Sequence, residues 1–220
     1  MITCRPATLA DIPQVRDINH WYILNSCFTF TTTPPAVSHY EDILRDLNRR
    51  QLPFYVIGSD TRKSDDGADL VLGYAYLSPW RGELLSCAST VELSVFMRND
   101  QRSFGYGSRL LKEMLALLES RGVNHCCEER VGDVARIGAH SMLGVMNTSP
   151  VNNVIAIMTF DPENGADGIR LRDWFNTLGF VQRGRLESVG KKWGRCSKIT
   201  ASVTDKLRGL TPCIYSGVVH

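Results

Sequence analysis

The sequence predicts an α+β, or mixed α/β, fold around one largely antiparallel sheet flanked by helices. The expected elements run strand, two helices, three strands, helix, strand, helix and two strands, and no internal repeat interrupts this order. The 220 residues, 43% of them hydrophobic and 22% charged, suffice for one globular domain with a sizeable core.

Composition and charge exclude several function classes. A formal net charge of +2 gives no global basic field of the kind that drives non-specific binding to nucleic acid. No apolar run approaches the roughly 18 residues of a membrane-spanning helix, and the N-terminus lacks a signal-peptide pattern. Seven scattered cysteines without a CxxC pair indicate reduced thiols. We therefore expect a cytoplasmic protein that binds neither nucleic acid nor membrane.

The chain is expected to open with a short strand over Ile2 to Cys4, followed by a helix. Thr8 to Asp11 is a capping-box pattern, with the Thr8 hydroxyl placed to cap free amides and Asp11 near the positive helix end. The apolar residues that repeat at helical spacing after it are Ile12, Val15, Ile18, Tyr22 and Ile23.

A break over Thr29 to Pro35 separates this helix from a second one. Ser38 to Glu41 is another capping-box pattern. The apolar residues that follow it on one helical face are Ile43, Leu44 and Leu47. Phe54 to Ile57 is expected to be a strand, and the polar segment Ser59 to Asp69 a turn.

The middle of the chain carries the strongest signals. Leu70 to Ser78 and Thr90 to Met97 are the best strand candidates. Gly107 to Arg121 is the best helix, because its leucines and methionine form a broad apolar stripe. Gly122 follows it, as a left-handed stop requires.

The segment from Asn124 to Asn153 has no clean period, and we interpret it as an insertion. A buried strand is expected over Val154 to Thr159, then a helix over Gly168 to Leu178 with Asp167 as its cap and Gly179 as its stop.

Phe180 to Ser188 and Cys196 to Val203 are expected to form a final hairpin. Residues 1–207 then make a single domain. The tail over 208–220 carries proline and glycine, so we expect it to be loosely held.

A glycine-rich turn joins the strand that ends at Met97 to the next helix. It reads Arg102-Ser103-Phe104-Gly105-Tyr106-Gly107. Glycines let the backbone curl and bring several N–H groups to one point, and the helix adds its positive end, so such a turn suits a pyrophosphate. It is neither a Walker A loop nor the longer Rossmann fingerprint. A tight connection without a ligand is the alternative.

One carboxylate stands inside the otherwise apolar strand expected over Thr90 to Met97. It is Glu92, which lies between Val91 and Leu93 and points to the opposite sheet face from them. Desolvation at such a position would raise its pKa, which suits a general base. A glutamate on a solvated sheet face is the alternative.

These residues resemble a known family. The run Thr90-Val91-Glu92-Leu93-Ser94-Val95-Phe96-Met97, with the glycine turn and Ser108-Arg109-Leu110-Leu111, resembles the acetyl-CoA-binding core of the GCN5-related N-acetyltransferases. More closely, it is similar to the phosphinothricin and methionine-sulfoximine acetyltransferases. Their pattern is Thr-x-Glu-x-Ser-Val-Tyr-Val, then Gln/Arg-x-x-Gly-x-Gly. The resemblance covers residues 2–207 apart from the expected insertion at 124–153.

The resemblance implies acetyl-CoA as the co-substrate and no metal. The residues that it assigns to the coenzyme are Val95, Phe96, Met97, Arg102, Ser103, Phe104, Gly105, Tyr106, Gly107, Ser108 and Asn164. It also implies that the strand ending at Met97 splays from the strand that begins at Val154, so that the pantetheine arm enters the gap. A free N–H near Phe96 or Met97 would then face the thioester oxygen.

Catalysis is assigned by the resemblance to Glu92, which would remove a proton from the substrate ammonium, directly or through water. No general acid is assigned, because Phe175 stands where many members of the superfamily have tyrosine. The residues that match the family's substrate pocket are Phe28, Phe30, Trp80 and Arg81. Arg81 is suited to hold a substrate carboxylate. A core position for Trp80 and a solvated one for Arg81 are the alternatives.

The closing hairpin departs from the family. This chain has Cys196-Ser197-Lys198 where relatives usually have an aromatic and an acidic residue. The basic residues of the hairpin are Arg183, Arg185, Lys191, Lys192 and Arg195. They form either a solvated face or a cluster that favours an anionic substrate or the coenzyme's 3′-phosphate.

The expected function is transfer of an acetyl group from acetyl-CoA to the primary amine of a small amino-acid-like substrate, by a homodimer. Two alternatives stay open. One is the same chemistry on a polyamine, peptide or protein amine, and the other is a non-catalytic acyl-CoA-binding module.

Overall fold

A seven-stranded sheet forms the centre of the molecule. The computed structural model describes residues 1–81, 84–127, 129–131, 134–136, 147–160, 165–192 and 195–204. The strands of the sheet are β1 (Ile2–Pro6), β2 (Phe54–Lys63), β3 (Asp69–Pro79), β4 (Thr90–Met97), β9 (Asn153–Phe160), β10 (Val181–Lys192) and β11 (Arg195–Thr204). Their order is β1-β2-β3-β4-β9-β11-β10, with β4 and β9 parallel and the other neighbours antiparallel. The predicted fold class is confirmed.

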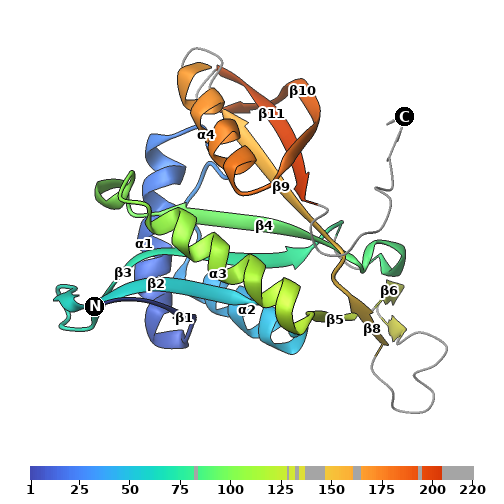
Figure 1. Ribbon diagram of the computed structural model, residues 1–220, viewed down its shortest axis with the longest axis horizontal. Helices are drawn as coiled ribbons and strands as arrows, with labels where there is room; N and C mark the ends of the chain where they lie inside the picture. Colours follow the sequence, from blue (N-terminus) through green and yellow to red (C-terminus); the bar gives the residue numbers. More distant parts are fainter. Residues whose placement is uncertain are drawn as a thin grey trace.

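Helices cover both faces of this sheet. They are α1 (Ile12–Asn25), α2 (Val37–Arg49), α3 (Tyr106–Arg121) and α4 (Gly165–Thr177). Figure 1 shows α3 crossing in front of β2, β3 and β4, with α1 and α2 behind these strands. On the other half of the sheet, α4 packs against β9 and β10.

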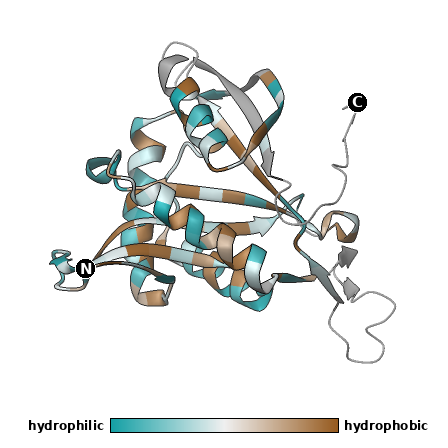
Figure 2. Ribbon diagram, viewed as in Figure 1, coloured by the Kyte–Doolittle hydropathy of each residue, from teal (hydrophilic) through white to brown (hydrophobic). Residues whose placement is uncertain are grey.

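The predicted apolar faces of the helices form the core. Ile12, Val15, Ile18, Tyr22 and Ile23 of α1 are all buried, as are Leu110, Leu111, Met114 and Leu118 of α3. Each fully buried leucine or isoleucine stabilises the fold by about 1.5–3 kcal/mol. Figure 2 shows the hydrophobic residues on the strands that these helices cover.

Some of the predicted helix caps and glycine stops are present in the structure. The Thr8 to Asp11 capping box is present on a short 3-10 turn, Leu9–Asp11, that leads into α1. Gly122 and Gly179 end their helices with φ of +65° and +88°.

The second predicted capping box, Ser38 to Glu41, is wrong. Helix α2 begins at Val37, with Ala36 as its N-cap and no side-chain cap. Val37 packs against the core, so burial of this residue starts the helix ahead of the serine. The cap at Asp167 is wrong as well, because α4 begins at Gly165 and Asp167 lies inside it.

The polar segment Ser59 to Asp69 is only partly a turn. Strand β2 continues to Lys63 and β3 begins at Asp69, so the turn is confined to 64–68. Ser59, the first residue of the polar segment, is 1% exposed, so its polar side chain does not indicate a turn.

The segment from Asn124 to Asn153 contains strands. Antiparallel pairs form between β5 (Asn124–Cys127) and β8 (Asn147–Pro150), and between β6 (Glu129–Val131) and β7 (Val134–Arg136). Residues 137–146 and the predicted tail over 208–220 lie outside the described residues. Among the helices that the structure describes, none has the length and apolar character to cross a membrane.

Candidate active site

Glu92 lies in β4 on the sheet face that α1 and α2 cover. The register pairs Glu92 with Ser78 of β3, and pairs its same-face neighbour Ser94 with Tyr76. The Tyr76 hydroxyl interacts with its cross-strand partner Ser94 and electrostatically with Glu92. Burial raises the pKa of Glu92 above its usual range, because removal from water disfavours the charged carboxylate. A half-buried carboxyl group with a raised pKa accepts a proton more readily than an exposed one, which suits a general base.

Strands β4 and β9 pair only over their first four residues. Their parallel register runs from Thr90 opposite Asn153 to Leu93 opposite Ala156, although both strands continue for several residues beyond this point. Figure 1 shows the two strands diverging. The predicted splay is confirmed, and we call this opening the β4–β9 gap.

Hydrogen bonds at the two ends of β4 show which peptide groups face this gap. The Trp80 N–H donates to the Thr90 carbonyl at 3.2 Å, and the Arg98 N–H donates to the Leu72 carbonyl at 2.8 Å. Peptide groups along a strand alternate between its two edges. The even-numbered residues of β4 therefore bond to β3, and the odd-numbered residues direct their peptide groups to the other edge.

Two residues of β4 lie beyond its pairing with β9 and belong to this odd-numbered set. They are Val95 and Met97, whose N–H groups face the β4–β9 gap. The Met97 carbonyl accepts a hydrogen bond from the Tyr22 hydroxyl at 2.7 Å. The N–H of Phe96 faces β3, so of the two donors that the sequence suggested, only Met97 points into the gap.

The turn between β4 and α3 leaves its backbone accessible. Ser103 and Gly105 adopt positive φ values of +68° and +79°. Gly105 is the N-cap of α3 and no side chain caps that helix end. A Cβ atom at Gly105 would meet nothing within 4 Å. The positive end of a 16-residue helix is thus presented beside open space, which suits an anion.

Larger side chains of this turn lie on its rim. The Arg102 guanidinium is 5.2 Å from the centre of the Trp21 ring and is hydrogen-bonded to Asn99. Phe104 is 66% exposed and stacks on Tyr106, with 6.0 Å between ring centres.

The far side of the turn is fixed to α4. Trp174 Nε1 donates to Ser108 Oγ at 2.8 Å. A Cβ atom at Gly107 would lie 3.4 Å from the Trp174 ring and 3.5 Å from Met97. Phe175 is 3% exposed and packs in the core.

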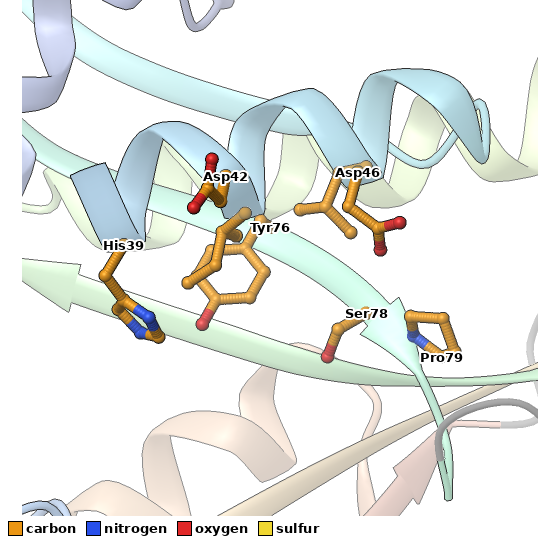
Figure 3. Close-up of a pocket in the computed structure, with 8 residues that line it drawn as sticks. His39, Asp42, Asp46, Tyr76, Ser78 and Pro79 are labelled. Carbon is orange, nitrogen blue, oxygen red and sulfur yellow. The ribbon is translucent and has the colours of Figure 1, made fainter. Parts of the chain in front are cut away.

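A pocket of about 370 Å³ opens between α2 and β3. The residues that line it are His39, Asp42, Ile43, Asp46, Leu47, Tyr76, Ser78 and Pro79. Figure 3 shows the α2 side chains on one side of it and Tyr76, Ser78 and Pro79 on the other. Because Ser78 is the cross-strand partner of Glu92, the pocket lies one strand away from that carboxylate. Sequence patterns did not reveal it, since its walls come from two elements that meet only in the folded chain.

The four residues predicted to bind the substrate come from two segments, and none lines this pocket. Phe28 packs edge-on to Tyr22 with 6.4 Å between ring centres, and Phe30 is 43% exposed. At the end of β3, Trp80 is half-buried and Arg81 is exposed with φ of +56°. Asn164, assigned by the resemblance to the coenzyme, lies outside the described residues.

The closing hairpin contacts the loop that follows α1, residues 26–30. Lys192 is 2% exposed, and its Nζ donates to the Thr29 carbonyl at 3.1 Å. A Cβ atom at Gly190 would lie 2.3 Å from the Phe30 ring, so only glycine permits this approach. The interpretation of the basic residues as one solvated face is therefore wrong for Lys192, although its neighbour Lys191 is exposed.

Comparison with known proteins identifies the family. No family model matches the chain. Over 193 residues it is 31% identical to the phosphinothricin N-acetyltransferase of Streptomyces viridochromogenes, an alignment that covers 88% of this chain and 81% of that protein. The chain belongs to the GCN5-related N-acetyltransferase (GNAT) superfamily. Another GNAT relative is the L-methionine sulfoximine/L-methionine sulfone acetyltransferase of Pseudomonas aeruginosa. It is 30% identical over 142 residues, which cover 64% of this chain and 77% of the relative.

Solved structures confirm the GNAT fold. A phosphinothricin acetyltransferase from Sinorhizobium meliloti, in complex with AcCoA, matches with a TM-score of 0.67 at 21% identity, covering 98% of this chain and 96% of that one. A ribosomal-protein-alanine N-acetyltransferase from Brucella melitensis matches with a TM-score of 0.66 at 23% identity, covering 92% and 99%. In the part of this GNAT chain that the structure describes, no group of three His, Cys, Asp or Glu side chains could hold a metal.

Proposed function

We propose that this GNAT protein transfers the acetyl group of acetyl-CoA to the primary amine of a small amino-acid-like substrate, of the phosphinothricin or methionine-sulfoximine type. One observation carries the proposal. A half-buried carboxylate, Glu92, stands on a strand whose free edge leads to a glycine turn at a helix N-terminus. The two relatives at 30 and 31% identity support the chemistry and the substrate class.

The coenzyme fits this arrangement in two places. The turn from Arg102 to Ser108 offers uncapped helix amides and the open space at Gly105 to the pyrophosphate. The peptide groups of Val95 and Met97 offer the pantetheine amides the hydrogen bonds of an added strand. The side chain of Phe96 lies on the α1 and α2 face, where it packs on Tyr22.

Glu92 acts as the general base in this proposal. It takes a proton from the substrate ammonium, directly or through a water molecule, and the neutral amine attacks the thioester carbonyl. Its raised pKa suits this role, since a base works best when its pKa lies near the working pH. The N–H of Met97, on the edge of β4 that faces the gap, would stabilise the negative charge that develops on the thioester oxygen.

The acceptor amine binds on the α1 and α2 face of the sheet. The pocket between α2 and β3 opens on this face. Phe28 reaches the same face through Tyr22, which packs on Phe96. We retain Phe30, Trp80 and Arg81 as substrate residues by resemblance, with Arg81 as the partner of a substrate carboxylate. Asp42 and Asp46 of the pocket are already paired with arginines of their own helix, so they do not favour a polycation.

The resemblance to this family also supports a proposal for the location and oligomeric state of the protein. We propose a cytoplasmic homodimer in which residues 1–207 form one domain and 124–153 are an insertion into it. The scattered cysteines support a reducing compartment. Sedimentation of the purified protein measures the oligomeric state directly.

A thiol-release assay tests the proposed reaction. Purified protein is mixed with acetyl-CoA, a thiol reagent and a panel of amines: phosphinothricin, methionine sulfoximine, a polyamine and a peptide N-terminus. We expect turnover with the amino-acid analogues and little with the polyamine. Absence of thiol release with every amino-acid analogue, from folded protein that binds acetyl-CoA, would overturn the proposal.

A further inference from the structure

The loop that follows α1, residues 26–30, reaches strands on both sides of the β4–β9 gap. On one side Phe28 packs edge-on to Tyr22, which in turn packs edge-on to Phe96 of β4 with 5.1 Å between ring centres. On the other side the Thr29 carbonyl accepts a hydrogen bond from Lys192 of β10. The loop therefore connects β4 to the closing hairpin, which belongs to the other half of the sheet.

These contacts lie at the open end of the β4–β9 gap. Gly190 of β10 pairs with Ser197 of β11, and the next residue of β11, Lys198, pairs with Phe160 at the end of β9. Strand β9 meets β4 only at its opposite end. The loop thus spans the gap where no strand pairing holds its two sides together.

Lys192 is an unusual residue for such a contact. An ammonium group that leaves water loses strong hydration and must be compensated by hydrogen bonds. Lys192 is 2% exposed, and burial lowers its pKa. One of its partners is the backbone carbonyl of Thr29, so this hydrogen bond acts on the path of the loop itself and not on one side chain. The Phe30 ring, seated on Gly190, makes a second contact beside it.

We propose that Lys192 is a positioning residue for the acceptor amine. By binding the Thr29 carbonyl, it holds Phe28 and Phe30 in place across the open end of the β4–β9 gap, and so shapes the acceptor side of the site. Its role rests on the proposed acetyltransferase function. The coenzyme side, at the glycine turn and along β4, does not involve this contact.

The test compares Lys192→Met, which removes the charge and its donors, with Lys192→Arg, which keeps them. Lys191→Met is the matched control, because Lys191 is the exposed neighbour on the same strand. In Lys192→Met we expect the KM for the amine to rise about tenfold, the order that one hydrogen bond to a charged group provides. The Kd for acetyl-CoA should change less than twofold. In Lys192→Arg, the KM for the amine should lie close to that of the unmodified protein.

Hydrogen exchange separates this proposal from the proposed function, because it needs no substrate. The amides of residues 26–32 should exchange about tenfold faster in Lys192→Met than in Lys191→Met. If Lys192→Met does not fold, Phe30→Ala removes the second contact from an exposed position and should loosen the same amides. Unchanged exchange and unchanged amine KM in folded variants would overturn the role of Lys192. Failure of the unmodified protein to acetylate any amine would overturn the function and leave the exchange result standing.

Discussion

Glu92 owes its proposed role to its immediate surroundings. It shares a sheet face with Ser94 and lies beside Tyr76, and it is partly withdrawn from water. We expect Glu92→Gln to lower kcat by at least about 100-fold, the usual contribution of a positioned general base. Acetyl-CoA binding, measured by calorimetry, should change little.

Two further measurements complete this test. Glu119→Gln, on the exposed face of α3, is the control and should retain full activity. Because burial raises the pKa of Glu92, the rate should fall as the pH decreases through a value above the ordinary range for glutamate. Turnover in Glu92→Gln that matches the unmodified protein would mean that another group is the base.

His125 gives the fold a dependence on pH that is separate from catalysis. It is 2% exposed, its Nδ1 lies 3.0 Å from the Ala88 carbonyl, and its Nε2 has no hydrogen-bond partner in the described part of the chain. Burial lowers the pKa of this imidazole below the ordinary value of 6.5. The unfolded chain therefore takes up a proton first as the pH falls, so stability should decrease from about pH 6.5 downward.

The variant His125→Asn tests this expectation. Its amide N–H can replace the Nδ1 donor but does not titrate. Denaturant midpoints measured between pH 7 and 5 should fall for the unmodified protein and fall less for the variant. His39→Asn, at an exposed position, is the control. An unchanged pH slope in His125→Asn would assign the acid sensitivity to other groups.

At the scale of the element, the glycine turn is the feature most exposed to a single substitution. Gly105→Ala places a Cβ in the open space before α3 and forces alanine into a left-handed conformation, at a cost of about 1–2 kcal/mol. We expect the Kd for acetyl-CoA to rise about tenfold or more by calorimetry, since the added methyl group lies where the pyrophosphate approaches.

Gly67→Ala is a matched control for this prediction. Gly67 has φ of +82°, also meets nothing within 4 Å, and lies in the β2–β3 turn, outside the residues assigned to the coenzyme. Both variants should lose a similar few degrees of Tm, but only Gly105→Ala should lose coenzyme affinity. Equal affinity in both would remove the turn from the coenzyme site.

The elements differ in how well the sequence predicts them, for physical reasons. The apolar stripes of α1 and α3 are long and bury one face, so periodicity alone predicts them. The extension of β2 beyond Ser59 is polar. It is held by the pairing of Lys63 with Asp69 of β3 and by a hydrogen bond from the Asp60 N–H to the Met1 carbonyl. Likewise α2 begins at Val37 because of a tertiary contact, which no capping pattern reports.

The site divides in the same way. Glu92 and the glycine turn lie within one continuous stretch, so their chemistry can be predicted from local sequence. The pocket beside Ser78 and the contact between Lys192 and Thr29 join segments that are far apart in the chain. The strand order and the helix packing bring these segments together, and the residue types in each segment do not indicate its partner.

At the scale of the whole molecule, the incomplete pairing of β4 with β9 predicts how the protein responds to its coenzyme. In the free protein, the amides of Val95 and Met97 should exchange faster than those of Val91 and Leu93, which pair with β9. Saturation with acetyl-CoA should slow the first pair selectively, as measured by residue-resolved hydrogen exchange. Equal protection of all four amides without coenzyme would contradict the open edge.

The open edge of β4 also links the thermal stability of the protein to the supply of acetyl-CoA. Acetyl-CoA, which completes the hydrogen bonding of the sheet, binds the folded chain and not the unfolded one. At a concentration 100 times its Kd, it adds about 2.7 kcal/mol to the free energy of unfolding. The protein should therefore survive warming better in a well-fed cell, where acetyl-CoA is plentiful, than in a starved one.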